Sequence, residues 1–334
     1  MYNSLSMSPE NDQHIIYTPE SLRGMPEKLP INVSQIDHSF PFPSEYSRMR
    51  LLALSDVDGS VTKVVEKTYG MKAGEKGHAM EMNRDQADAM GDLVLQYVNQ
   101  LNVIGITVAT VYQTKSVPID ESNNLYGVRI LQEFVDAPNF EHVWQKAIQE
   151  KDLNKQKQLA ESLFDIVHRV TNFRSNADNS HLFPYKPVDV FDSAAPIDLK
   201  PNNFMVNNKE NTPIIVLVDV MYPPVRGANG RFVVLDIVQG SESKDPGWQH
   251  LPERLANKKG LYPKTILELA ACAGDCDNLE MLRFLERLVL DYLDHKEDPK
   301  VRIAVENEIQ AGYEHYLEMA GRGEKIRFQK IFEN

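Results

Sequence analysis

Two hydrophobic periods divide the chain into an N-terminal part and a longer C-terminal part. Residues 46–70 form two β-like runs, rich in aliphatic residues, that are joined by Asp-Val-Asp-Gly at 56–59. An Asp-Gly pair between two β-rich runs predicts a hairpin. From residue 140 onward, apolar residues recur every three to four positions, which predicts helices at 140–150, 155–173, 263–273, 278–295 and 300–320. The pattern therefore predicts an α+β protein with a small antiparallel sheet followed by a mainly helical part.

One further helix is predicted within the N-terminal part, at residues 82–101, with Asn83 as its N-cap. A strand is predicted at 126–135, and the Asp-Ala-Pro sequence that follows it is a break before the first C-terminal helix. Residues 1–30 are polar with scattered prolines and are expected to form a tail. We therefore expect three regions: a tail at 1–30, a sheet-containing lobe at 31–135 and a helical lobe at 136–334.

Charge and cysteine content exclude several classes of partner and site. The formal net charge of −12 argues against nucleic acid or an anionic membrane as a partner, because both select for basic surfaces. Cys272 and Cys276 have no histidine near them in the sequence, so they form neither a disulfide framework nor a zinc pattern. The N-terminus lacks the features of a signal peptide, and no apolar run approaches the ~20 residues that span a bilayer. We therefore expect a cytoplasmic protein.

The segment that carries the most chemical information is Pro196–Pro224. It contains Asp-Leu-Lys-Pro-Asn-Asn at 198–203 and then an apolar run at 214–218 that ends on Asp219. An acid, an amide five residues later and a second acid after a β-like run resemble the catalytic centre of the protein-kinase-like superfamily. The surroundings are more similar to its aminoglycoside-phosphotransferase and small-molecule-kinase branch than to the eukaryotic protein kinases. The resemblance implies a two-lobed protein-kinase-like fold, with a small antiparallel-sheet N-lobe, a mainly helical C-lobe and a catalytic loop at 196–220.

The resemblance also implies a role for four residues of this segment. Asp198 would orient the attacking hydroxyl or accept its proton, and Lys200 would neutralise charge on the transferred phosphoryl group. Asn203 and Asp219 would bind Mg²⁺, a hard ion that prefers oxygen donors. The expected cofactors are ATP and Mg²⁺, and the expected reaction is phosphorylation of a hydroxyl group of a small molecule. The acidic balance of the chain favours an amine-bearing metabolite or an aminoglycoside-like acceptor.

In the N-terminal part, Val-Val-Glu-Lys at 64–67 is similar to the third-strand motif of the family. Lys67 would then pair with the ATP phosphates, and Asp85 or Asp88 on the following helix would pair with Lys67. Backbone groups of the hinge, around Glu133 to Val135, would bind adenine.

Two departures from the family pattern keep open a function without catalysis. The segment at 40–46, in the place of the phosphate-covering loop, has no glycine, and Pro196 occupies the position of the usual catalytic-loop histidine. A kinase-shaped protein that has lost phosphoryl transfer and acts as a binding or scaffold module would share both features.

A competing interpretation places the chemistry at Asp56. Asp56-Val-Asp58 after an apolar run resembles the first motif of haloacid-dehalogenase-like phosphatases, with the first acid as nucleophile and the second as acid and base. Thr110, Lys258 or Lys259, and the 273–282 segment would then supply the remaining motifs. Three observations count against this interpretation. The residues after 60 continue as a strand, the 273–282 segment lies in a helical pattern, and the motif at 198–219 would be left without a role.

Overall fold

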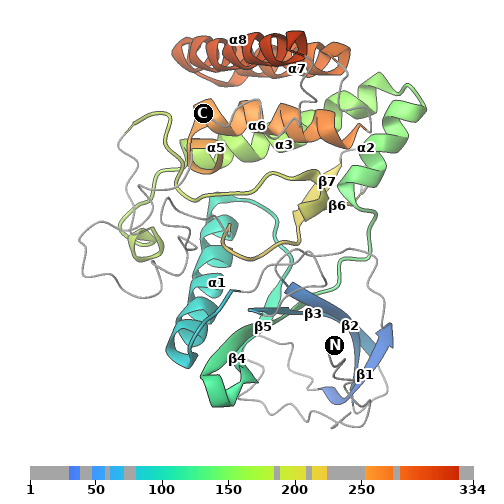
Figure 1. Ribbon diagram of the computed structural model, residues 1–334, viewed down its shortest axis with the longest axis vertical. Coiled ribbons are helices and arrows are strands. Elements are labelled where there is room, and N and C mark those ends of the chain that lie inside the picture. Colours follow the sequence, from blue (N-terminus) through green and yellow to red (C-terminus); the bar gives the residue numbers. More distant parts are fainter. Residues whose placement is uncertain are drawn as a thin grey trace. The chain divides into compact units, whose positions relative to one another are not determined.

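The structure is a computed structural model that describes residues 30–37, 47–56, 61–70, 80–183, 189–207, 213–223, 253–273 and 279–322. It is a mixed α+β protein with a small antiparallel sheet and several helices (Figure 1). The chain separates into two compact units. We call them the sheet unit, Met1–Gly91 with Thr110–Phe134, and the helical unit, Asp92–Ala109 with Val135–Asn334. The expected tail at 1–30 lies outside the described residues except for Pro30, which begins a strand. The phosphate-loop segment at 40–46 and residues 231–238, whose sequence pattern is β-like, also lie outside them.

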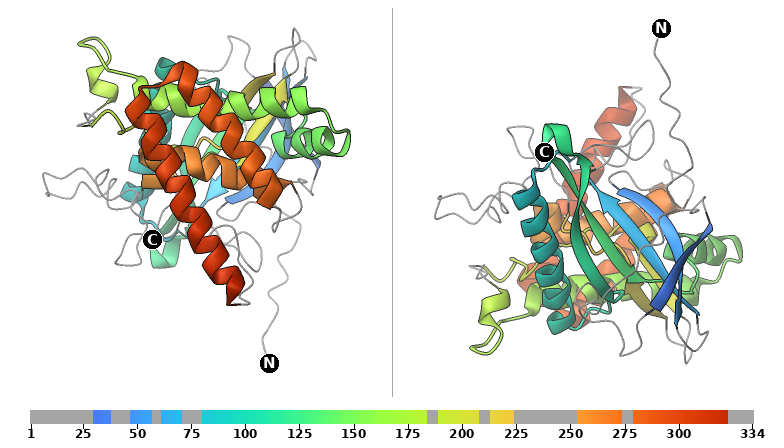
Figure 2. Two further views of the ribbon diagram at one scale, coloured as in Figure 1. Left: turned by 90° about the horizontal axis from the view of Figure 1, so that it is seen from above. Right: turned by 90° about the horizontal axis from the view of Figure 1, so that it is seen from below.

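The sheet unit is built on five antiparallel strands in the order β1-β2-β3-β5-β4 (Figure 2). The predicted hairpin is confirmed, because β2 and β3 pair from Ser47↔Tyr69 to Ser55↔Val61. Buried β-branched side chains from β3 and β5, such as Val64 and Ile130, form the apolar core of the sheet. The strands are β1 (Pro30–Asp37), β2 (Ser47–Asp56), β3 (Val61–Tyr69), β4 (Val111–Asp120) and β5 (Leu125–Glu133), with a 3-10 turn, η2 (Glu121–Asn123), between the last two.

The helix α1 (Arg84–Ile104) begins with a reciprocal cap. The Asn83 side chain accepts a hydrogen bond from the Gln86 N–H at 2.9 Å, and the Gln86 side chain accepts one from the Asn83 N–H at 2.8 Å. This capping box satisfies two N–H groups at the start of the helix and confirms Asn83 as the N-cap.

The second half of α1 and the residues after it group with the helical unit, whereas the sequence placed this whole stretch with the sheet. The reason is hydrogen bonding. The Ala109 N–H donates to the Leu217 carbonyl at 2.8 Å, and the Leu217 N–H donates to the Thr107 carbonyl at 2.9 Å.

Besides the second half of α1, the helical unit contains six complete α-helices and a two-stranded hairpin among its described residues. In Figure 1, α7 and α8 form a layer over α3 and α6, and the β6–β7 hairpin lies on the other side of α3 and α6. Aromatic side chains fill the centre of this unit, and the buried Trp144 indole donates to the Leu269 carbonyl at 2.9 Å. The elements are α2 (Phe140–Gln149), α3 (Leu153–Asn172), β6 (Phe204–Asn207), β7 (Ile214–Leu217), α5 (Glu253–Ala256), α6 (Lys258–Cys272), α7 (Leu279–Lys296) and α8 (Pro299–Gly321).

The predicted start of α6 at Pro263 is wrong. The helix begins at Lys258, because the Asn257 side chain caps it by accepting a hydrogen bond from the Lys259 N–H at 2.9 Å. A proline early in a helix is often its first residue, but here the helix continues through Pro263.

The long irregular stretch at 174–197 contains only a short 3-10 turn, η3 (Ser180–Leu182), among its described residues. Its end is hydrogen-bonded to α5 and to the start of α6. The Lys258 N–H donates to the Phe191 carbonyl at 2.8 Å, the Ser193 N–H to Ala256 at 2.9 Å, and the Ile197 N–H to Leu255 at 3.0 Å. These bonds hold the chain against α5 and the start of α6 up to Ile197, the residue immediately before Asp198.

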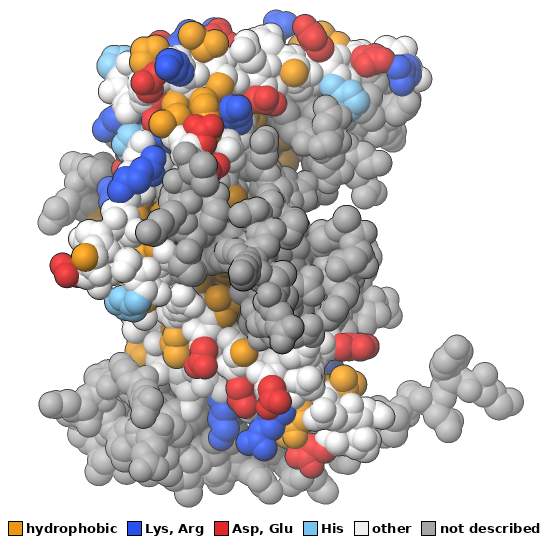
Figure 3. Space-filling view, turned by 90° about the vertical axis from the view of Figure 1, so that its left-hand side faces the viewer, with side chains coloured by type: hydrophobic (Ala, Val, Ile, Leu, Met, Phe, Trp, Pro, Cys, Tyr) orange, Lys and Arg blue, Asp and Glu red, His pale blue; other side chains and the backbone are white. Residues whose placement is uncertain are grey.

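The surface over α7 and α8 carries both signs of charge side by side (Figure 3). Arg302, for example, lies 2.7 Å from Asp294. In the part of the chain that the structure describes, no helix combines the length and the apolar character needed to cross a membrane.

Candidate functional site

The β6–β7 hairpin brings the two ends of the predicted catalytic segment together. Phe204 pairs with Leu217 at the open end of the hairpin, so Asn203 just before β6 lies beside Val218 just after β7. The Val218 N–H donates to the Asn203 carbonyl at 2.9 Å, and Asp219 follows directly. Asp219 comes sixteen positions after Asn203 in the sequence, but the antiparallel pairing places the two residues at the same end of the hairpin.

Asp198 lies between two lysines. The Lys264 ammonium is 3.1 Å from Oδ1 of Asp198, and the Lys200 ammonium is 3.5 Å from Oδ2. Lys264 also bonds Glu268 one turn later on α6, at 2.7 Å. The Lys264 side chain is 12% exposed and that of Lys200 is 36% exposed, so Lys264 is held in place while Lys200 reaches solvent.

These lysines keep the candidate base ionised. Burial alone would raise the pKa of the Asp198 carboxyl, but the charges and hydrogen bonds of Lys264 and Lys200 outweigh it, and the pKa lies below its ordinary value. The carboxyl is therefore a carboxylate at neutral pH. It is suited to accept a hydrogen bond from a hydroxyl group.

Asn203 and Asp219 offer oxygen donors that match the preference of Mg²⁺. The Asn203 amide nitrogen donates to the Asp198 carbonyl at 3.2 Å, which turns its Oδ1 away from that carbonyl. Asp219 Oδ1 is 3.5 Å from the Met221 N–H, in a turn immediately after the hairpin. No three His, Cys, Asp or Glu side chains converge as a metal cluster within the described ranges. Mg²⁺ is usually held by one or two carboxylates with waters and phosphates, and an amide and a carboxylate fit that mode.

Tyr97 on α1 is a component of the site that the sequence did not reveal. Its hydroxyl donates to the Pro196 carbonyl at 2.8 Å, and its ring contacts the ring of Tyr222, with centroids 5.6 Å apart. Burial raises the pKa of Tyr97 well above its usual value, and the negative charges of Asp219 and Asp198 raise it further. Both candidate acids therefore act on one hydroxyl.

Lys264 was missed for a different reason. In the sequence it is one lysine of a helix, and the acid it contacts is 66 positions away. The only local signal is Glu268, which stands four residues later and marks a helical ion pair.

The other predicted residues belong mostly to the sheet unit. Lys67 on β3 is only 6% exposed, so it is not a solvated strand lysine. The adjacent Glu66 is also buried and is bonded by Arg50, with Arg129 at 3.9 Å. Asp85 and Asp88 lie on the exposed face of α1.

Asp88 pairs with Arg84 on the same helix, at 3.9 Å. The predicted pairing of Lys67 with one of these aspartates stays a prediction.

The predicted hinge is partly engaged by its own surroundings. The Glu133 N–H donates to the Thr110 carbonyl at 2.8 Å, and the Glu133 carboxylate accepts from the Thr110 hydroxyl at 3.0 Å. The Val135 carbonyl accepts from the Ala137 N–H at 2.9 Å. The predicted use of this stretch for adenine would therefore depend on the remaining backbone groups.

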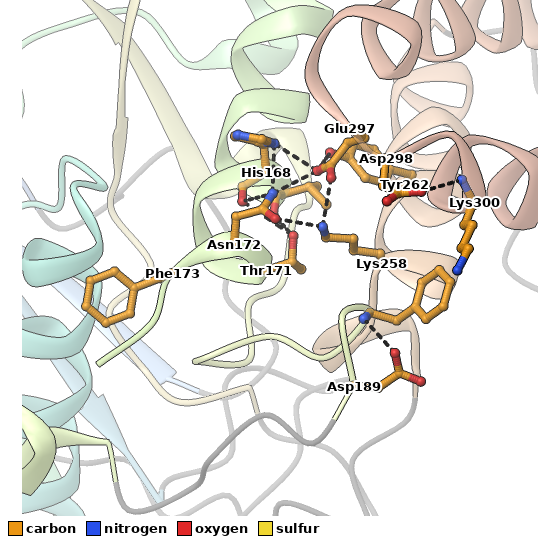
Figure 4. A network of polar contacts seen from close by, with 12 residues as sticks. His168, Thr171, Asn172, Phe173, Asp189, Lys258, Tyr262, Glu297, Asp298 and Lys300 are labelled. Atoms are coloured by element: carbon orange, nitrogen blue, oxygen red, sulfur yellow. Dashed lines mark hydrogen bonds and ion pairs between the residues drawn. The ribbon is translucent and has the colours of Figure 1, made fainter. Parts of the chain in front are cut away.

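A second buried polar network joins α3, α6 and the α7–α8 connection (Figure 4). The Lys258 ammonium bonds Glu297 at 2.8 Å and the Asn172 side chain at 2.9 Å. His168 lies 2.8 Å from Glu297, and Tyr262 donates to the same carboxylate at 3.1 Å. Burial by itself would raise the pKa of Glu297, but the hydrogen bonds of Lys258, His168 and Asn172, with the charge of Lys258, lower it below the ordinary value. Lys258 is committed to this structural ion pair.

The sheet also argues against the phosphatase interpretation. Asp56 ends β2, which pairs antiparallel with β1 and β3. For Asp56 to act as in a doubly wound fold, it would have to lie at the carboxyl end of a parallel strand that is followed by a crossover helix. Here β2 leads into a hairpin, and Thr110 is bonded to Glu133.

Comparison with known proteins finds distant likeness in structure but none in sequence. The sequence matches no protein-family model and no curated protein. Among solved structures, the chain is similar to one described as "WaaP in complex with acyl carrier protein", with 12% sequence identity and a TM-score of 0.31. The similarity covers 73% of this chain and 87% of that chain. At this TM-score we base the function on the geometry of the chain itself.

Proposed function

We propose that this protein is an ATP- and Mg²⁺-dependent phosphotransferase with a two-lobed kinase-like fold, and that it phosphorylates a hydroxyl group of a small molecule. The observation that carries the proposal is the hydrogen bond from Val218 to Asn203. It places Asp219 beside the end of the segment that begins with Asp198. An ionised acid, an amide and a second acid are the groups that kinase chemistry requires.

Asp198 is proposed to orient the acceptor hydroxyl. As a carboxylate it accepts a hydrogen bond from the hydroxyl, which aims an oxygen lone pair at the phosphoryl group. A carboxylate with a lowered pKa is a weak base, so the proton moves to it late in the transfer, when the hydroxyl has already become more acidic.

The two lysines are proposed to differ in role because they differ in exposure to solvent. Lys264 is bonded to Glu268 and Asp198 and would hold the carboxylate in one orientation. Lys200 is more exposed and would reach the phosphoryl oxygens to offset their charge.

Asn203 and Asp219 would hold Mg²⁺, which when bound neutralises charge on the ATP phosphates. Lys67 is proposed to contact the same phosphates. The preferred acceptor remains an amine-bearing metabolite or an aminoglycoside-like compound.

The test is ATP turnover with a panel of small alcohols and amino sugars, with phosphomonoester products followed by phosphorus NMR. We expect Asp198→Asn and Asp219→Asn to lower turnover by about 100-fold or more, and Asp56→Asn to leave it within about 2-fold. Loss of activity in Asp56→Asn alone, together with hydrolysis of a generic phosphomonoester, would instead support the phosphatase interpretation.

A further inference from the structure

Pro196 gives the candidate catalytic segment an unusual start. A proline has no backbone N–H and no polar side chain, so its carbonyl is the only polar group by which this position can be held. That carbonyl accepts the hydroxyl of Tyr97 at 2.8 Å, across 99 positions of sequence. The Tyr97 side chain is 2% exposed, so the bond is shielded from water.

The same side chain also contacts the segment that carries the second acid. Its ring meets the Tyr222 ring edge-on, at an interplanar angle of 61°, and Tyr222 follows Asp219 by three residues. Tyr222 is completely buried. Tyr97 therefore touches two chain segments that are otherwise joined through the Val218–Asn203 hydrogen bond.

Two neighbouring side chains fix the helix that carries Tyr97. The amide groups of Gln96 and Gln100 both donate to the Leu182 carbonyl, and Gln100 is buried. The helix thus has three side-chain donors on one face that are bonded to backbone carbonyls of the 174–197 stretch and its end.

We propose that Tyr97 is a positioning residue that holds Asp198 and Asp219 in register with each other. This proposal rests on the proposed function and deepens it. Tyr97 touches no reacting atom. It acts through the Pro196 carbonyl on one segment and through the Tyr222 ring on the other.

The decisive variant is Tyr97→Phe, which removes the hydroxyl and keeps the ring. Its matched control is Tyr292→Phe, because the Tyr292 hydroxyl also makes a 2.8 Å hydrogen bond, to Asp165, and Tyr292 is 7% exposed. Both variants lose one hydrogen-bonded tyrosine hydroxyl, and they differ in which segments that hydroxyl holds.

The first readout is calorimetric binding of a non-hydrolysable ATP analogue with and without Mg²⁺. We expect Tyr97→Phe to weaken binding in Mg²⁺ about 3- to 10-fold, the size of one hydrogen bond, and to leave binding without Mg²⁺ unchanged. Tyr292→Phe should change neither value by more than about 2-fold. Equal effects of the two variants on Mg²⁺-dependent binding would overturn the proposal.

The second readout needs no nucleotide and separates this proposal from the proposed function. Hydrogen exchange should become about 3- to 10-fold faster in Tyr97→Phe at the amides of both 197–203 and 218–222. In Tyr292→Phe these amides should exchange as in the wild type. Faster exchange in only one of the two segments, or in neither, would overturn the proposal. A wild type that binds no nucleotide would contradict the proposed function alone.

Discussion

Replacing Lys258 with Met tests the energetic importance of the buried network in Figure 4. Lys258 is 2% exposed and Glu297 is 3% exposed, so the substitution leaves a buried carboxylate without its cation. Breaking one side of a buried ion pair costs about 3–5 kcal/mol. Glu297 keeps its contacts with Asn172, Tyr262 and His168, so we expect the lower end, about 3 kcal/mol.

The assay is urea unfolding followed by far-ultraviolet circular dichroism, which reports the helices. With a urea slope of roughly 3 kcal/mol per molar, the midpoint should fall by about 1 M. The control is Lys157→Met, which removes a half-exposed lysine that lies 3.5 Å from Asp291. An exposed pair contributes about 0–1 kcal/mol, so the control should barely move the midpoint. Equal shifts in the two variants would refute the reasoning.

Three further predictions concern pH, the candidate base and the first helix. The folded-state pKa of Glu297 lies below its unfolded value of about 4.3, so its stabilisation is present above that pH and is lost as the pH falls through the folded pKa. The stability gap between wild type and Glu297→Gln should therefore be present at about pH 5 and shrink below about pH 4 in urea titrations. Lys264→Met should lower turnover about 10-fold or more with nucleotide affinity unchanged, and Lys264→Arg should recover part of the lost turnover. Loss of nucleotide affinity in Lys264→Met would contradict a role through Asp198. Asn83→Ala should destabilise α1 by about 1 kcal/mol in thermal unfolding, whereas no shift would show that the capping box contributes nothing.

Local periodicity predicted much of the fold. The helix expected at 155–173 is α3 at Leu153–Asn172, and the predicted hairpin corresponds to the antiparallel pair of β2 and β3. These elements are determined by neighbouring residues, through the apolar stripe of an amphipathic helix and the turn preference of Asp-Gly. The start of α6 was wrong because a favourable cap at Asn257 outweighed the usual position of a helical proline.

The candidate site could be predicted only where its residues share one segment. Asp198, Asn203 and Asp219 are close in sequence, and the hairpin between them follows from two short apolar runs. Tyr97 and Lys264 reach the same segment from distant helices. A buried tyrosine usually needs a partner for its hydroxyl, but periodicity does not say which carbonyl it will meet.

The measurement that tests the central claim most directly is calorimetric titration with a non-hydrolysable ATP analogue, with and without Mg²⁺, on the wild type and on Asp219→Asn. The account predicts binding to the wild type that strengthens with Mg²⁺, and loss of that Mg²⁺ dependence in the variant. Binding that is weak and indifferent to Mg²⁺ in both proteins would contradict it, and would favour a kinase-shaped binding module without phosphoryl transfer.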